Sequence, residues 1–203
     1  VHGALTHFFP WVAQQFGLSS QDRFAMLSGL AHDPLQRDMF NALWFGATLC
    51  IPHPDQFSPR ALASWMQAQH ISAVNLTPAM LQILCTDAIP LPQLQHAFLI
   101  GDVLTRSDVA QLQAIAPAAR VVSYYGATET QRAFGYHIIE AGQAPQLAQE
   151  VVPLGTGMPG VQLLLLNRAG QMAGIGEAAE IVMRTPHLAR GYRNDAELTQ
   201  QRF

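Results

Sequence analysis

Three dipeptides divide the first part of the chain into repeated strand–helix units: Asp-Pro at 33–34, Ser-Pro at 58–59 and Thr-Pro at 77–78. Each pairs a residue that caps helix N-termini with a proline, whose fixed φ suits the first helical position. A short apolar run typical of a buried strand follows each helix that these pairs predict. Because strands alternate with helices, we predict an α/β fold, with a parallel layered sheet and flanking helices.

The predicted elements of this fold can be assigned by apolar periodicity and by helix start and stop signals. The first helix contains Pro10, which should kink it or mark a late start. In the second helix, Leu35, Met39, Phe40 and Leu43 share one apolar face. Helices are expected at 3–16, 34–45, 58–69, 77–85 and 105–115. Strands are expected at 23–30, 47–51, 71–76, 97–100 and 121–124.

The character of the chain changes after residue 130. A polar segment at 141–149 reads as a loop, and a glycine-rich turn follows at 155–160. Two apolar runs, 161–166 and 178–183, are joined through glycines and predict an antiparallel, hairpin-like pair of strands. We therefore expect an α/β subdomain at 1–150 and the start of a smaller β-rich subdomain at 151–203, with a helix beginning near Asp195.

Composition excludes several classes of partner. The net charge is −3 with 12% charged residues, whereas a nucleic-acid-binding surface is usually basic. No apolar run approaches the roughly 20 residues of a membrane helix, and no secretory leader opens the chain. Cys50 and Cys85 lack metal-ligand spacing and suit buried positions in a reducing compartment. We expect no nucleic-acid partner, no membrane partner and a cytoplasmic location.

The segment 123–130, Ser-Tyr-Tyr-Gly-Ala-Thr-Glu-Thr, groups aromatic, hydroxyl and carboxylate side chains that could bind a ligand. As a loop after a buried strand, it offers a tyrosine face for a flat heterocycle and a glycine that allows close backbone approach. Thr128 can donate to a phosphate, and Glu129 can hold a hard cation such as Mg²⁺. The alternative is an ordinary turn whose tyrosines pack in the core.

In parallel sheets, ligands bind beyond the carboxyl ends of the strands. Under the predicted strand assignment this rule gathers residues that are distant in sequence on one edge of the sheet. They are Asp33, Asn75, Gly101, Asp102 and the segment 124–130.

Two motifs in order resemble the signatures of the adenylate-forming enzymes. One is Tyr-Gly-x-Thr-Glu at 125–129; the other runs from Gly-Glu at 176–177 to Ala-Arg-Gly-Tyr at 189–192. The resemblance covers essentially the whole chain. Within this superfamily the chain most resembles amino-acid adenylation domains of nonribosomal peptide synthetases, in the subgroup of the α-aminoadipate reductases and reductase-terminated synthetases. The segments 29–40, 76–80, 101–105 and 128–132 carry that likeness.

The resemblance implies an ATP-dependent ligase that forms an aminoacyl-adenylate and then a thioester. It implies ATP and Mg²⁺ as cofactors and an amino acid as substrate. The implied partners are a peptidyl carrier protein domain bearing phosphopantetheine and a downstream NAD(P)H-dependent reductase domain. Neutralisation of phosphate charge and positioning of the reactants would carry the catalysis.

The family's functional positions can be carried over residue by residue. Thr128 matches the phosphate-contacting threonine and Glu129 the Mg²⁺ ligand, and both are assigned as catalytic. Asp33 matches the aspartate that pairs with the substrate α-ammonium; the alternative is the N-cap of its helix, and one carboxylate can serve in both roles. Positions implied to bind the nucleotide are Gly101, Asp102, Ser123, Tyr125, Gly126 and Thr128. Positions implied to line the substrate pocket are Asp33, Pro34, Arg37, Asn75, Phe98, Ile100, Tyr124, Arg132 and Ala133.

Arg37 and Arg132 are the informative pair in this pocket. A buried arginine usually has an anionic partner, so the pair favours a substrate with a side-chain carboxylate. The alternative for Arg37 is a solvated helix face. Asn75 and Tyr124 differ from the pattern expected for aminoadipate, which leaves the exact amino acid open.

Two rival functions remain: a standalone acyl- or aryl-CoA synthetase, and a non-catalytic adenylation-like docking module. Asp33 argues against the first, because a carboxylate would repel a substrate without an ammonium group. The intact residues at 125–129 argue against the second. The family's phosphate loop, ribose-binding aspartate and catalytic lysine have no match within the sequence. We interpret the chain as an excised piece that is inactive alone.

Overall fold

The computed structural model describes residues 3–130, 132–146 and 148–203. Within these residues the larger sheet has seven strands in the order β2-β1-β3-β4-β5-β6-β7. The first five are parallel, whereas β6 and β7 run antiparallel to their neighbours. The strands are β1 (Arg23–Ala25), β2 (Thr48–Cys50), β3 (Ala73–Leu76), β4 (His96–Leu99), β5 (Arg120–Ala127), β6 (Arg132–Ile139) and β7 (Thr156–Gly157).

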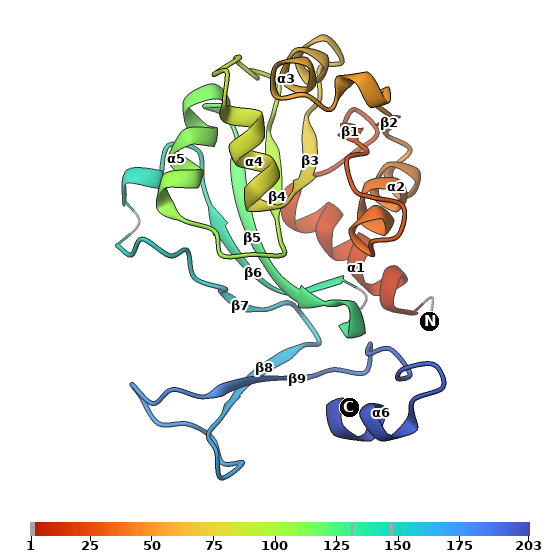
Figure 1. Ribbon diagram of the computed structural model, residues 1–203, viewed down its shortest axis with the longest axis vertical. Helices are drawn as coiled ribbons and strands as arrows, with labels where there is room; N and C mark the ends of the chain where they lie inside the picture. Colours follow the sequence, from red (N-terminus) through yellow and green to blue (C-terminus); the bar gives the residue numbers. More distant parts are fainter. Residues whose placement is uncertain (1–2, 131, 147) are drawn as a thin grey trace.

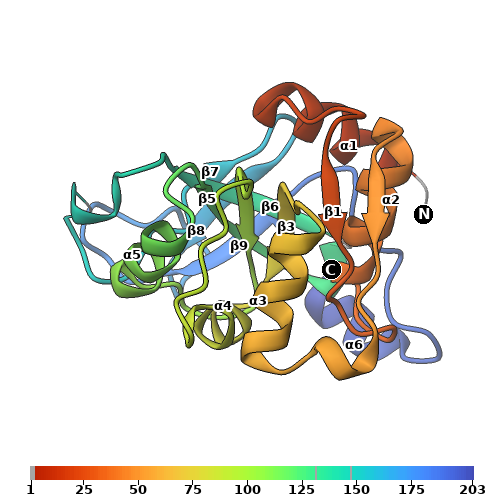
Figure 2. The same cartoon turned by 90° about the horizontal axis from the view of Figure 1, so that it is seen from above.

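Helices cover both faces of this sheet, with α3, α4 and α5 on one side and α1 on the other (Figures 1 and 2). The layered α/β architecture predicted from the sequence is therefore confirmed. The α-helices are α1 (Gly3–Phe16), α2 (Pro34–Phe45), α3 (Pro59–Ala68), α4 (Pro78–Cys85), α5 (Arg106–Ile115) and α6 (Ala196–Arg202). Short 3₁₀ turns lie at η1 (Pro54–Gln56), η2 (Thr128–Thr130) and η3 (Ala144–Gln146).

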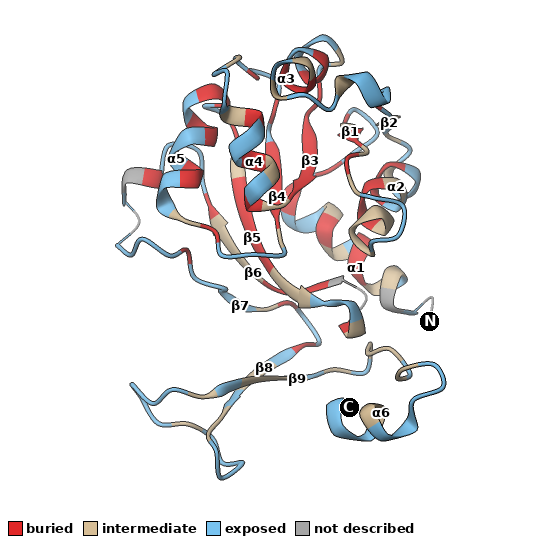
Figure 3. Ribbon diagram, in the orientation of Figure 1, coloured by how far each residue is buried: buried red, intermediate tan, exposed pale blue. Residues whose placement is uncertain are grey.

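The core consists of two clusters, because side chains of one strand alternate between the sheet faces. On β3, Val74 belongs to the cluster under α3, α4 and α5, whereas Ala73 belongs to the cluster under α1. On β4, Ala97 and Phe98 divide in the same way. The central strands are consequently buried on both faces (Figure 3), which explains why they appear in the sequence as continuous apolar runs.

The predicted helix starts differ in how they are capped. The Thr77 hydroxyl accepts a hydrogen bond from Met80 N at 3.2 Å, and Thr105 forms a capping box with Asp108. Ser58 and Asp33 make no side-chain cap bond. Asp33 already has helical dihedral angles, φ −61° and ψ −27°, so the predicted carboxylate cap is wrong although the helix begins at the predicted proline.

The predicted apolar face of α2 is not its buried face. Phe40 is 38% exposed and Leu43 is 66% exposed. The residues that α2 buries include Arg37, Asp38 and Asn41. Helical periodicity alone cannot show which face meets the sheet. Here the inward face lies beside the strand ends, where polar side chains form the candidate site.

Three strand predictions need correction. The strand expected at 23–30 is only β1, because Leu27 N and Ser28 N donate to the Asp38 carboxylate at 3.1 and 2.9 Å. The loop expected after residue 124 is instead strand as far as Ala127, with a register shift between Tyr125 and Gly126. The extension exists because β6, which was not predicted, pairs with β5 along its length.

The second, smaller sheet pairs β8 (Gln162–Leu166) with β9 (Glu180–Arg184) in antiparallel register. The predicted hairpin-like element is thus confirmed. β7 still pairs with β6, so the larger sheet extends past the boundary predicted between residues 150 and 151. The predicted helix near Asp195 is α6, whose first turn is capped by the Asp195 carboxylate accepting from Leu198 N at 2.9 Å.

The approach to β7 allows no side chain at Gly155. Gly155 has φ +78°, and a Cβ atom there would lie 1.9 Å from the carbonyl oxygen of Tyr136. We predict that Gly155→Ala lowers the free energy of unfolding by about 3 kcal/mol or more, measured by urea unfolding with hydrogen exchange of β6. Gly142→Ala is the control, because φ is +74° with open space around it, and should cost only about 1 kcal/mol. Equal losses would contradict the steric account.

The described helices and the two cysteines can be compared with the expectations from the sequence. None of the described helices is both long and apolar enough to cross a membrane. Cys50 is buried as expected, whereas Cys85 is only half-buried, and both are free thiols.

Candidate functional site

A cavity of about 410 Å³ opens at the carboxyl ends of β4 and β5. Its lining brings together five of the six positions implied to bind the nucleotide. They are Gly101, Asp102, Ser123, Tyr125 and Gly126. Val103, Leu104, Val151, Val152 and Leu154 add an apolar wall. A mostly apolar slot with a few polar groups at its edge is the usual form of a small-molecule site, and a flat heterocycle fits it chemically.

The backbone at Gly101 adopts φ +103°, a conformation that other residues rarely take. Asp102 follows, and its Oδ1 accepts from Val103 N at 2.7 Å. This turn follows the end of β4, and its residues line the cavity. Ser123, by contrast, is buried on β5.

A hydrogen bond between Asp33 and Thr128 connects the predicted amino-acid side of the site with the predicted phosphate side. The Thr128 hydroxyl donates to Asp33 Oδ1 at 3.2 Å, although the residues are 95 positions apart in the chain. Thr128 lies on η2 beyond β5, and Asp33 precedes α2. The predicted substrate-ammonium position and the predicted phosphate position therefore share one edge of the sheet, at a distance that one substrate can span.

Glu129 is held from the opposite side by the smaller sheet's segment. The Tyr192 hydroxyl donates to Glu129 Oε1, and the backbone N–H of Ala189 donates to the Glu129 carbonyl at 2.8 Å. The hydrogen bond from Tyr192 lowers the pKa of the Glu129 carboxyl, and Arg202 acts in the same direction. The group is therefore an ionised, half-buried carboxylate at neutral pH.

A single carboxylate is compatible with Mg²⁺ in a nucleotide site. Among the residues that the structure describes, no three histidine, cysteine or acidic side chains cluster as a metal site. Mg²⁺ is commonly bound by one or two carboxylates with the remaining positions filled by substrate phosphates and water. The donor chemistry at Glu129 fits this arrangement, with the Thr128 hydroxyl next to it in the chain.

Arg37 is the most unusual side chain of the site. It is 2% exposed, and its three guanidinium nitrogens have no hydrogen-bond partner among the described residues. Burial lowers its pKa, while Tyr124, Asp33 and Asp38 oppose that shift. The solvated helix face considered for Arg37 is therefore wrong. Buried donors without partners are rare, so this group is suited to an anionic ligand.

Tyr124 resembles Arg37 in this respect. Its hydroxyl is buried without a hydrogen-bond partner among the described residues, and burial raises the pKa of the phenol. Its ring stacks on Phe98 with centroids 5.5 Å apart and an interplanar angle of 5°. The stacked ring of Phe98 thus holds the Tyr124 ring in place.

The other predicted pocket residues lie in two places. Pro34, Asn75 and Ile100 line a small cavity of about 80 Å³, together with His32 and Thr77. Ala133 is buried on β6, where it pairs with Gly126 of β5. Arg132 lies at the start of β6 opposite Ala127, but its side chain falls outside the described part of the structure.

Asp38 is a residue beside the candidate site that the sequence analysis missed. It is 0% exposed, and its Oδ1 accepts from Asn75 Nδ2 at 2.8 Å while Oδ2 accepts from two backbone N–H groups. Burial raises its pKa against these hydrogen bonds. Asp38 fixes the Asn75 amide and the segment after β1. The available signal was a carboxylate next to an arginine on a helix face with few other charges.

Comparison with known proteins gives consistent results. Residues 1–193 match the family model described as AMP-binding enzyme. The chain is 44% identical over 210 residues to an L-2-aminoadipate reductase of Schizosaccharomyces pombe, covering 100% of this chain and 15% of that protein. The chain therefore spans about 15% of the length of this curated relative.

Solved structures agree in fold over nearly the same residues. A crystal structure of the nonribosomal peptide synthetase FmoA3 superposes with a TM-score of 0.89 at 28% identity, covering 100% of this chain and 22% of that one. The AMPPNP-bound form of FmoA3 gives a TM-score of 0.87 at 28% identity, covering 98% and 22%.

Proposed function

The chain belongs to the AMP-binding enzyme family, and from this premise we propose that it is the central part of an adenylation domain that activates an α-amino acid with ATP. In the first half-reaction the substrate carboxylate attacks the α-phosphate. A new C–O–P linkage forms at the α-phosphorus. The P–O bond that joins the α-phosphorus to the β-phosphate breaks, and pyrophosphate leaves. In the second, a thiol attacks the acyl carbon and AMP leaves.

The observation that carries this proposal is the hydrogen bond between Asp33 and Thr128. It supports a single site with an amino-acid side, where Asp33 pairs with the α-ammonium, and a phosphate side, where Thr128 donates to a phosphate oxygen. The 410 Å³ cavity beside Tyr125 and Gly101 then accepts the adenine. A cation at Glu129 would neutralise phosphate charge as it develops. Holding the two reactants in one geometry supplies much of the rate enhancement.

We propose further that the activated amino acid carries an acidic side chain, of the α-aminoadipate type. Arg37 is a buried cation without a partner among the described residues, and the Tyr124 hydroxyl is a second unused donor beside it. A distal carboxylate would satisfy both. The relative named L-2-aminoadipate reductase supports the same substrate class. Arg132 is proposed as the second cation.

The proposed partners follow from the second half-reaction. The thiol would be the phosphopantetheine of a peptidyl carrier protein domain, and an NAD(P)H-dependent reductase domain would then release the product. The relative's name, a reductase, supports this sequence of steps. Both partners would lie in other parts of a longer enzyme.

A panel of amino acids in pyrophosphate exchange tests the proposal. With the intact enzyme, we predict exchange with 2-aminoadipate or glutamate at least tenfold faster than with leucine, phenylalanine or lysine, because only the acidic side chains pair with Arg37. Exchange with leucine above every acidic substrate would refute the substrate class but keep the activity. No exchange with any amino acid would refute the adenylation proposal itself.

A further inference from the structure

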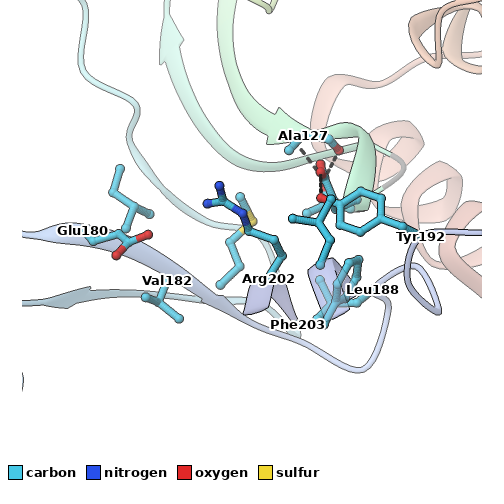
Figure 4. Close-up of a pocket in the computed structure, with 12 residues that line it drawn as sticks. Ala127, Glu180, Val182, Leu188, Tyr192, Arg202 and Phe203 are labelled. Carbon is cyan, nitrogen blue, oxygen red and sulfur yellow. Dashed lines mark hydrogen bonds between the residues drawn. The ribbon is translucent and has the colours of Figure 1, made fainter. Parts of the chain in front are cut away.

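The segment Leu188–Tyr192, which follows the smaller sheet, contacts the end of β5 at Glu129. The backbone N–H of Ala189 donates to the Glu129 carbonyl at 2.8 Å. The Tyr192 hydroxyl donates to the Glu129 side chain, 63 residues away in sequence. In Figure 4 the Tyr192 side chain lies close to Ala127, at the end of β5. Both residues line a cavity of about 540 Å³. Backbone and side chain of one glutamate are thus held by one segment.

Tyr192 is itself held in place through both its backbone and its ring. Its backbone N–H donates to the Thr199 hydroxyl at 2.9 Å, and that hydroxyl donates to the Asp195 carbonyl at 2.7 Å. Its ring packs edge-on against Phe203, with centroids 5.7 Å apart. At Gly191 a Cβ atom would lie 2.4 Å from the Thr199 side chain. The close approach that glycine permits there brings Tyr192 onto the N-terminal turn of α6.

The contact is more specific than packing requires. The phenol contacts one carboxylate oxygen, Oε1, and so restrains the carboxylate without using Oε2. Arg202, a cation whose charge also acts on Glu129, lines the same cavity. Carboxylates that bind metals are usually oriented by such outer hydrogen bonds, and losing one typically weakens metal binding 10- to 100-fold.

We propose that Tyr192 is a positioning residue, which orients the Glu129 carboxylate for the divalent cation of the adenylation reaction. The inference rests on the proposed function. It assigns a task to the smaller sheet's segment, which otherwise contributes no side chain to the predicted site. Tyr192 touches neither substrate nor phosphate in this role; it acts through Glu129.

Tyr192→Phe tests the proposal, because phenylalanine keeps the ring against Phe203 and removes only the hydroxyl. The measurement uses Mn²⁺ as the probe, with the intact enzyme and a non-hydrolysable ATP analogue, and follows free Mn²⁺ by electron paramagnetic resonance. We expect about tenfold weaker Mn²⁺ binding with an unchanged thermal midpoint. Tyr136→Phe is the matched control: its ring packs on Trp11 at 4.9 Å, and its loss of a hydroxyl should leave Mn²⁺ affinity unchanged.

The outcomes separate this inference from the proposed function. Wild-type Mn²⁺ affinity in Tyr192→Phe would overturn the positioning role, even if the enzyme adenylates amino acids normally. Tighter Mn²⁺ binding would also overturn it, since the phenol would then be competing with the cation. Weaker binding in Tyr192→Phe, with no change in Tyr136→Phe, supports the proposal. Failure of the wild-type enzyme to adenylate any amino acid bears on the proposed function alone.

Discussion

Replacing Glu129 by glutamine is expected to lower amino-acid-dependent pyrophosphate exchange by the intact enzyme about 100-fold, the usual scale for losing one electrostatic contact to a transition state. A neutral amide is a poor ligand for Mg²⁺, which prefers carboxylate oxygens. The amide still presents an oxygen to the Tyr192 hydroxyl, which is the partner of Glu129 in the structure. The fold at the end of β5 should therefore survive, and the loss should appear in the rate at saturating ATP.

The control for this prediction is Glu140→Gln. Glu140 is an exposed carboxylate paired with Arg120 at 2.8 Å, beyond the end of β6. Exposed ion pairs contribute little to stability, so its exchange rate should match the wild type. A Glu129→Gln enzyme that keeps its full rate across a Mg²⁺ titration would remove Glu129 from the site.

The second large effect is expected at Arg37. Arg37→Met should depress exchange with 2-aminoadipate or glutamate by about 2 to 5 kcal/mol in transition-state free energy, because the substrate carboxylate is then buried without its partner. With a neutral amino acid of similar length the change should be far smaller. The measurement is kcat/KM for both substrates in the wild type and the variant.

Arg37→Met also makes a stability prediction that separates binding from structure. The guanidinium is buried without a hydrogen-bond partner among the described residues, so an apolar side chain of similar size should leave the thermal midpoint unchanged or raise it. Arg37→Lys is the companion variant: it keeps a charge but loses the planar fork that matches a carboxylate, and it should recover only part of the activity. Equal losses with acidic and neutral substrates would contradict the assigned role.

Local sequence signals determined the elements and their order. Proline after a capping residue predicted where α2, α3 and α4 begin, and α2 ends at the predicted residue 45, just before Gly46 with φ +65°. These features depend on a few neighbouring residues, so they can be predicted without the fold. The alternation of such elements was sufficient to predict the layered sheet and the edge at which the site lies.

Pairing partners were harder to predict. β6 was missed because its sequence shows no strong alternation of apolar and polar residues. It forms a strand because it pairs with β5 after the chain reverses at η2. The strand expected at 23–30 ended early because Asp38, on the following helix, takes the backbone donors of Leu27 and Ser28. Both outcomes result from tertiary contacts that compete with local propensity.

Only the tertiary structure decided how the site is assembled. Asp33 was a candidate cap by sequence, but its carboxylate faces Thr128, 95 residues away. Arg37 was ambiguous between a solvated and a buried face, and the packing of α2 against the strand ends buries it. The contacts of Asp38 with Asn75 and of Tyr192 with Glu129 were not recognised from the sequence. Sequence patterns describe which groups a segment offers, whereas contact between distant segments depends on how the sheets and helices pack, and that packing determined which of these groups meet.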